Sequence, residues 1–293
     1  MQKIIPFLWF DNQAEEAMNF YKTIFKNSKI GRITRYGEAG PGPKGTVMSV
    51  TFQLEGQEFY ALNGGPEFTF TPAVSFFVNC DTQEEIDMLW EMLSENGTIL
   101  MEMNSYPFSE KFGWVMDQFG VSWQLNLGGA VQKINPFLMF VGEQHGKAEE
   151  AMNFYTSIFE NSSIVSIERY KTGEDEPERT VKRATFLLNG QEFMAIDSNG
   201  PHSFTFTPAI SFFVNCETQE EVDELWEKLS QGGEKHGPGW LKDKYGLSWQ
   251  IVPTVLDELL NDHDPEKSQR VMEAMFQMEK LDIEKLKEAY KGK

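Results

Sequence analysis

Two glutamines, Gln124 and Gln250, are the polar side chains with the most distinctive setting. Each follows a Ser-Trp pair in an apolar stretch, so strand alternation turns the Trp and the Gln to opposite faces. A buried amide needs hydrogen-bond partners. Each glutamine therefore either bonds within the core or contacts a ligand on the floor of a cup, and the sequence leaves both interpretations open.

The four histidines are the next candidates, because imidazole is a common metal ligand. His145, His202, His236 and His263 all lie in the second half of the chain. Three fall in predicted loops, one opens the tail, and none lies in a strand opposite Gln250. We expect exposed loop histidines, no metal site and no cofactor, with a divalent metal as the less favoured alternative.

Other residue patterns that could suggest a chemical function have a structural explanation. Residues 37–45 are glycine-rich, but they lie between two predicted strands and contain two prolines, which indicates a flexible loop and not a phosphate cradle. Asp117 and Asp243 fall in hairpin turns of the Asp-x-x-Gly type. Cys80 and Cys216 lack a C-x-x-C partner and are expected to be buried thiols. No Ser-His-Asp or Cys-His arrangement is visible.

Composition excludes several classes of function. The formal net charge of −19 repels phosphate backbones and anionic lipids, so neither nucleic acid nor a membrane surface is an expected partner. No apolar stretch approaches the roughly 20 residues of a membrane span. The apolar start meets Asp11 at once, which predicts a strand and not a signal peptide. We expect a cytoplasmic protein.

An internal duplication sets the domain organisation. Residues 14–21 recur as 148–155, residues 68–73 as 204–209, and residues 114–124 as 240–250 with conservative changes. These matches predict a first domain over 1–130, a second copy over 131–255 and a helical tail over 256–293.

Each copy divides again into two βαβββ modules. In the first module, strands are predicted over 4–10, 29–36, 46–54 and 57–62, with a helix from Ala14 whose inner face is Ala14, Ala17, Met18, Tyr21 and Phe25. In the second, strands are predicted over 73–79, 97–103, 112–116 and 121–127, with a helix from Asp81 or Thr82 to Ser94. The tail begins a helix at Asp264-Pro265 and a second near Asp282.

Paired βαβββ modules resemble the vicinal oxygen chelate superfamily, which includes glyoxalase I, bleomycin-resistance proteins and extradiol dioxygenases. Within it the chain looks like a tandem member of the PhnB-like family, often labelled 3-demethylubiquinone-9 3-methyltransferase. The residues that carry the likeness are 6–10, 14–21, 76–80 and 239–250, and the tail is also similar. The resemblance implies an α+β fold in which paired modules curl into a cup around a ligand.

The resemblance also implies where a metal would be held. The superfamily's ligand positions fall at Pro6 and Pro136, near Asn63 and Asp197, near Val74 and Ile210, and at Gln124 and Gln250. Proline, valine and isoleucine cannot ligate through their side chains, and neutral amides hold dications weakly. Methyl transfer with S-adenosylmethionine is also disfavoured, because no alternating βαβα run with a glycine-rich first turn occurs.

The favoured hypothesis is a small-molecule-binding protein with two cups lined by aromatic and amide side chains. The ligand-binding candidates are Trp9, Asn63, Trp114, Gln124, Asp197, Trp240 and Gln250. One alternative is a metal-dependent lyase, isomerase or dioxygenase of the same superfamily. Another is a structural or interaction module, and a homodimer stays open.

Overall fold

The computed structural model describes residues 2–37 and 42–292, so residues 38–41 of the predicted glycine-rich loop lie outside it. The first repeat contains β1 (Ile4–Phe10), α1 (Ala14–Ile24), β2 (Ser28–Arg35), β3 (Val47–Leu54), β4 (Gln57–Asn63), β5 (Val74–Cys80), α2 (Gln83–Ser94), β6 (Thr98–Tyr106), β7 (Ser109–Met116) and β8 (Ser122–Leu127). Each predicted strand and helix of this repeat is present with bounds shifted by a few residues.

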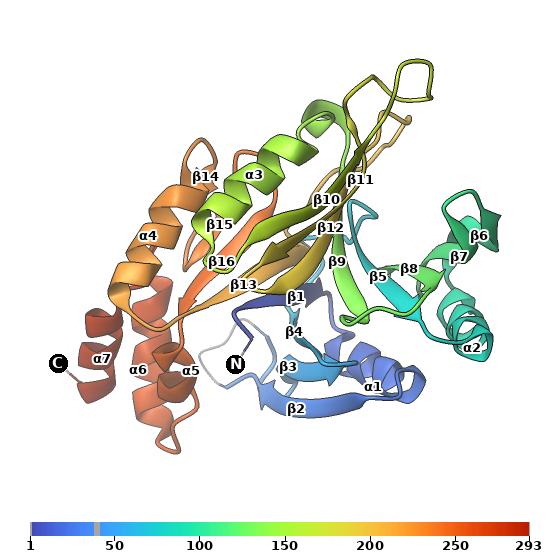
Figure 1. Cartoon of the computed structure of the whole chain (residues 1–293). Helices are drawn as coiled ribbons and strands as arrows, with labels where there is room; N and C mark the ends of the chain where they lie inside the picture. Colours follow the sequence, from blue (N-terminus) through green and yellow to red (C-terminus); the bar gives the residue numbers. More distant parts are fainter. Residues whose placement is uncertain (1, 38–41, 293) are drawn as a thin grey trace.

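The second repeat follows the same order (Figure 1). It contains β9 (Ile134–Phe140), a 3-10 turn (Gly142–Gln144), α3 (Ala148–Ile158), β10 (Ser163–Arg169), β11 (Val181–Leu188), β12 (Gln191–Asp197), β13 (Ile210–Cys216), α4 (Gln219–Ser230), β14 (Glu234–Lys235), β15 (Trp240–Lys242) and β16 (Ser248–Pro253). The tail forms α5 (Val255–Leu260), α6 (Pro265–Phe276) and α7 (Ile283–Lys291). The fold is therefore α+β, as expected, and none of the helices in the described residues is long and apolar enough to cross a membrane.

Each of the two eight-stranded sheets is assembled from both repeats. Sheet A runs β14-β15-β16-β13-β1-β4-β3-β2, and sheet B runs β10-β11-β12-β9-β5-β8-β7-β6. Antiparallel pairing of β1 with β13 joins the halves of sheet A, and pairing of β5 with β9 joins those of sheet B. The two modules of one repeat therefore belong to different sheets.

Helices α1 to α4 cover the inner faces of the sheets, and these faces share one continuous core. The predicted inner face of α1 is confirmed, since Ala14, Ala17, Met18 and Tyr21 are all buried. Thr82 caps α2 by accepting a hydrogen bond from the Glu85 backbone N–H at 3.2 Å. Burial of these apolar faces is the main stabilising term.

A buried carboxylate ties the two modules of each repeat together. Asp117 accepts hydrogen bonds from the Tyr21 hydroxyl at 2.7 Å and the Trp123 indole N–H at 2.8 Å, and two turn N–H groups also donate to it. The turn itself closes as predicted, with the Gly120 N–H donating to the Asp117 carbonyl. Tyr21 lies in α1 and Asp117 follows β7, so the bond links a helix of sheet A to a turn of sheet B.

The second repeat contains the same arrangement around Asp243. Tyr155 donates to its carboxylate at 2.7 Å and Trp249 at 2.8 Å. Burial raises the pKa of Asp117 and of Asp243 to about 6, even though the four donors around each carboxylate act in the opposite direction.

The tail packs beside the shortened hairpin of the second repeat. Strands β6 and β7 form a long hairpin in the first repeat, but their counterparts β14 and β15 have two and three residues. The Gly239 N–H instead donates to the Glu279 carbonyl at 2.7 Å. Asp264 and Asp282 cap α6 and α7, as the sequence predicts, and Figure 1 shows α5, α6 and α7 together at one end of the molecule.

Replacing Asp243 by alanine should lower the free energy of unfolding by about 3 kcal/mol or more, because it leaves buried donors unsatisfied. Tyr155→Phe removes one donor and leaves the carboxylate in place, so we expect a loss of about 1 kcal/mol. Urea unfolding at pH 7 followed by circular dichroism measures both. Equal losses for the two variants would contradict the central role of the carboxylate.

The raised pKa of Asp243 predicts a pH dependence of defined sign. Its folded value of about 6 exceeds the roughly 3.9 of an unfolded aspartate. Its contribution to stability is therefore fully present below pH ~4 and is lost as pH rises through about 6. Relative to Asp243→Asn, the wild-type protein should gain about 1 kcal/mol of unfolding free energy between pH 7.5 and 5.0. A constant difference between the two proteins would count against the shift.

Candidate functional site

Strand alternation leaves one face of each sheet without α1 to α4. On β9, Ile134, Leu138 and Phe140 join the main core, whereas Phe137 and Met139 belong to a separate apolar cluster on the opposite face. We call this second face cup face B in sheet B and its counterpart in sheet A cup face A. Trp123 and Trp249 point into the core, so Gln124 and Gln250 lie on the cup faces, as alternation predicts.

A row of polar and aromatic side chains crosses cup face B. Phe77 pairs with Asn135 on one side and with Gln124 on the other. Gln124 in turn pairs with Trp114. Met194 on β12 pairs with Phe137 on β9. Two residues earlier on each strand, Glu192 therefore lies beside Asn135, which extends the row to β12. In strand order this row, which we call row B, is Glu192, Asn135, Phe77, Gln124 and Trp114.

Two side chains of row B form hydrogen bonds within the sheet. The Gln124 side-chain amide donates to the Ser75 hydroxyl at 2.8 Å, and the Trp114 indole donates to the Ser122 hydroxyl at 2.8 Å. Gln124 is 4% exposed, whereas Trp114 is only half-buried. Gln124 is thus a hydrogen bonder within the sheet, and its amide oxygen is the half that a ligand could use.

Cup face A carries the equivalent row, and the tail covers part of it. Its members, in strand order, are Glu58, Ile5, Phe213, Gln250 and Trp240. The Gln250 amide donates to the Ser211 hydroxyl at 3.0 Å. Phe213 packs against the apolar cluster of the tail, which also includes Val252 and Leu256. The tail therefore covers part of this row.

Aromatic rings fill the rest of cup face A. The Trp240 ring lies 6.1 Å from Trp9 and 5.6 Å from Phe7, measured between centroids. Trp9 also contacts Phe68 at 4.9 Å and donates to the Gly65 carbonyl at 2.9 Å. Arg32 on β2 forms an ion pair with Asp257 of α5, which brings the tail to the far strand of the sheet.

Asn63 and Asp197 occupy equivalent places away from the cup faces. The Asn63 side-chain Oδ1 atom accepts from the Ala14 backbone N–H at 2.8 Å, and its side-chain amide donates to the Val47 carbonyl. Asp197 accepts from the backbone N–H groups of Ala148 and Val181. Burial is the main cause of its raised pKa. Both side chains are engaged in positioning helix starts, and the structure does not bring them together with the glutamines.

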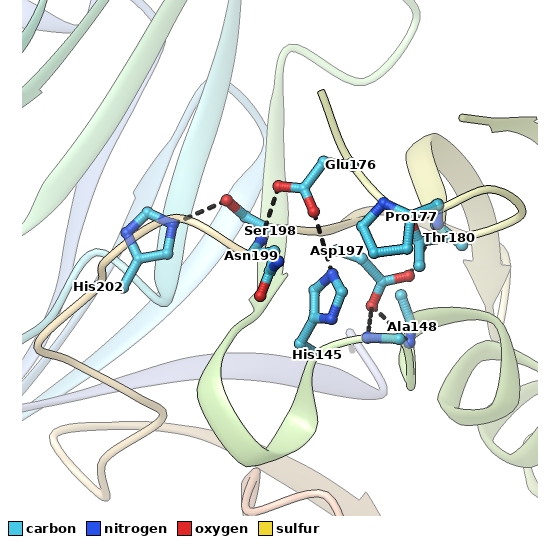
Figure 2. Close-up of polar contacts among 11 residues, drawn as sticks. His145, Ala148, Glu176, Pro177, Thr180, Asp197, Ser198, Asn199 and His202 are labelled. Carbon is cyan, nitrogen blue, oxygen red and sulfur yellow. Dashed lines mark hydrogen bonds and ion pairs between the residues drawn. The ribbon is translucent and has the colours of Figure 1, made fainter. Parts of the chain in front are cut away.

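Two of the histidines expected to be exposed, His145 and His202, are instead partly buried in a polar cluster beside Asp197 (Figure 2). Glu176 contacts the His145 Nε2 atom at 3.1 Å and accepts from the Asn199 N–H at 2.6 Å. The Ser198 hydroxyl lies 2.7 Å from the His202 Nε2 atom. Glu176 and Ser198 stand where the first repeat has Gly42 and Gly64. A comparison of the repeats is therefore a signal that could have found the cluster.

His202 connects this cluster to cup face B. Its ring lies 4.9 Å from Phe204, measured between centroids, and Phe204 packs on the apolar cluster that contains Phe137 and Met139. The Ser198–His202 pair therefore lies at the rim of cup face B. No described residue completes a nucleophilic triad with it, because Asp197 uses its oxygens on backbone N–H groups.

The cup faces do not fit a divalent metal. Within residues 2–37 and 42–292, no group of three or more His, Cys, Asp or Glu side chains could hold one. Pro6 lies on the core side of β1, and the cup-side residue next to it is Phe7. The glutamines donate to serine hydroxyls, and neutral amides are weak ligands for dications.

Two surface hollows lie outside the cup faces. One, of about 460 Å³, is lined by residues of α6 and α7 and their ends, among them Arg270 and Glu273. The other, of about 440 Å³, lies beside α4 around Glu227 and Lys235. Neither contains a predicted site residue.

Comparison with known proteins places the chain in a family. A family model described as 3-demethylubiquinone-9 3-methyltransferase matches residues 2–126 and 132–252. The chain is 54% identical to a solved structure described as a putative 3-demethylubiquinone-9 3-methyltransferase, PhnB protein, from Bacillus cereus; the match covers 43% of this chain and 100% of that one, with a TM-score of 0.42. Among curated proteins, none matches.

The likeness to glyoxalase I from Zea mays extends over most of the molecule. It covers 89% of this chain and 96% of that one, at 12% identity and a TM-score of 0.59, and shows the fold alone. A putative dioxygenase from Bacillus subtilis matches at 12% identity over 84% of this chain and 83% of that one, with a TM-score of 0.48. Because the family model matches both repeats, this chain belongs to the 3-demethylubiquinone-9 3-methyltransferase (PhnB-like) family, as a tandem member with a glyoxalase-type fold.

Proposed function

We propose that this chain is a small-molecule-binding protein whose ligand lies on cup face B. The observation that carries the proposal is row B, which combines amide and carboxyl groups with aromatic rings on strands from both repeats. Aromatic surface with a few placed polar groups is the usual lining of a small-molecule site. A partly apolar ligand with polar substituents would match it.

The asymmetry between the cup faces supports the choice of face B. On cup face A the tail packs on Phe213, and the rings of Trp9 and Trp240 contact one another. On cup face B, Phe77 and Trp114 pack on the cluster of Phe137 and Met139, which contains no residue of the tail. A ligand on face A would have to displace apolar contacts of the tail, which opposes binding there.

Sheet B also supplies a complete cup face within one chain. Its β9–β12 strands come from the second repeat and its β5–β8 strands from the first. Binding therefore needs no residue from a second copy. We further propose that the protein works in the cytoplasm, where its two buried free thiols, Cys80 and Cys216, are stable.

The family's description names a methyl transfer, but we propose binding without that chemistry. Ordinary methyltransferases hold S-adenosylmethionine on a doubly wound sheet with a glycine-rich first turn. Here both sheets mix parallel and antiparallel neighbours, and β1 leads into α1 through Asp11, Asn12 and Gln13. This topology offers no such turn at the start of α1.

Matched glutamine variants test the placement. With Nile red as a neutral fluorescent probe, Gln124→Ala should weaken binding about fivefold, because it removes about 1 kcal/mol of side-chain packing from row B. Gln250→Ala removes the same bond to serine on the covered face, so binding should stay within about twofold of wild type. A fluorescence titration measures both affinities.

The two variants lose equivalent serine bonds, so their melting temperatures provide the control for folding. A similar loss of Nile red affinity in both would contradict the preference for cup face B. Absence of Nile red binding to the folded wild-type protein would overturn the proposed function itself.

A further inference from the structure

One acceptor on cup face B is buried without a donor. Among the side chains that the structure describes, the Asn135 Oδ1 atom is buried and has no hydrogen-bond partner. Asn135 is 0% exposed, and its amide nitrogen donates to the Gln132 carbonyl at 3.4 Å. The Oδ1 atom is the end of this amide without a partner. A buried unpaired acceptor lowers stability, so it calls for a physical explanation.

Asn135 lies on the cup side of β9, the side proposed for the ligand. Asn135 lies between Glu192 and Phe77 in row B, on the same side of β9 as Phe137 and Met139. Phe77 and Glu192 are both half-buried, and burial raises the pKa of the Glu192 carboxyl. A neutral acceptor and a carboxyl group therefore lie on adjacent strands, about 5 Å apart in the pairing direction.

The first repeat shows that an asparagine is not needed to build the sheet. Its equivalent position is Ile5, which is fully buried on cup face A and pairs with Phe213. Glu58 stands where the second repeat has Glu192. The polar replacement is therefore confined to the face that the tail leaves uncovered.

We propose that cup face B selects ligands with a hydrogen-bond donor, and above all a protonated amine, which Asn135 and Glu192 would receive. The inference rests on the proposed function and names the ligand class for that same site. A cation would also be attracted to the faces of Phe77 and Trp114. The net charge of −19 favours the approach of cations to the protein.

Three probes that differ in one group test the selection. 2-Phenylethylamine is a cation, 2-phenylethanol is a neutral donor and 3-phenylpropionate is an anion. Each is titrated against Nile red bound to the full chain, and displacement gives its affinity. We expect the amine to bind at least tenfold more tightly than the carboxylate, with the alcohol between them.

Two variants assign the selection to residues. Asn135→Ile installs the residue of the first repeat, and Glu192→Gln removes the charge. Each should weaken the amine at least fivefold while Nile red, which has no N–H or O–H donor, stays within about twofold. Glu58→Gln on cup face A is the matched control and should leave the amine affinity unchanged.

The outcomes separate this inference from the proposed function. Equal binding of amine and carboxylate, or unchanged amine affinity in Asn135→Ile, would overturn the donor selection. The proposed site would still stand in that case if Nile red binding depends on Gln124. Failure of all three probes to displace Nile red would also overturn the selection. If Nile red itself does not bind, both proposals fall.

Discussion

The structure depends on two buried aspartates that bridge its sheets. The modules of one repeat lie in different sheets, so the repeat needs a contact that spans the space between them. The Asp117 carboxylate provides it by accepting from Tyr21 in α1 and from Trp123 in β8. Its desolvation is unfavourable, and the four donors offset that loss only while the geometry is intact. This requirement fixes the distance between α1 and the turn after β7, and with it the shared core.

The duplication has produced two cup faces that are no longer alike. A shortened β14–β15 pair leaves an edge that the tail occupies through the contact between Gly239 and Glu279. The tail then covers Phe213 and Val252, which became part of its apolar cluster. Cup face B keeps the long hairpin instead, and its positions equivalent to Val252 and Ile5 are Asn126 and Asn135. The shortened hairpin thus goes together with the covering of one face, and the polar positions lie on the other.

The local parts of this architecture were predictable from the sequence. Period and capping residues identified α1, α2 and the tail helices, because those signals lie within a few residues of each element. Alternation also placed Gln124 opposite Trp123 correctly. The short helix α5 was missed, since its six residues are too few to show a period.

The nonlocal parts were not predictable. Two similar repeats can pair within themselves or with each other, and no local residue decides between these arrangements. In the structure they pair with each other, through β1–β13 and β5–β9. Asp117 was predicted as a turn residue, but its link to Tyr21 spans 96 positions. The His145–Glu176 contact likewise joins two loops 31 residues apart.

The unequal faces change what a tandem chain needs for binding. Because each sheet takes one module from each repeat, each cup face contains residues of both repeats. Asn135 belongs to the second repeat, yet its row partners Phe77, Gln124 and Trp114 belong to the first. The repeats therefore cannot be assigned as one active and one inactive copy. The sheet, and not the repeat, is the unit that could be retained or covered. The tail follows the second repeat, yet it covers a face whose β1–β4 strands come from the first.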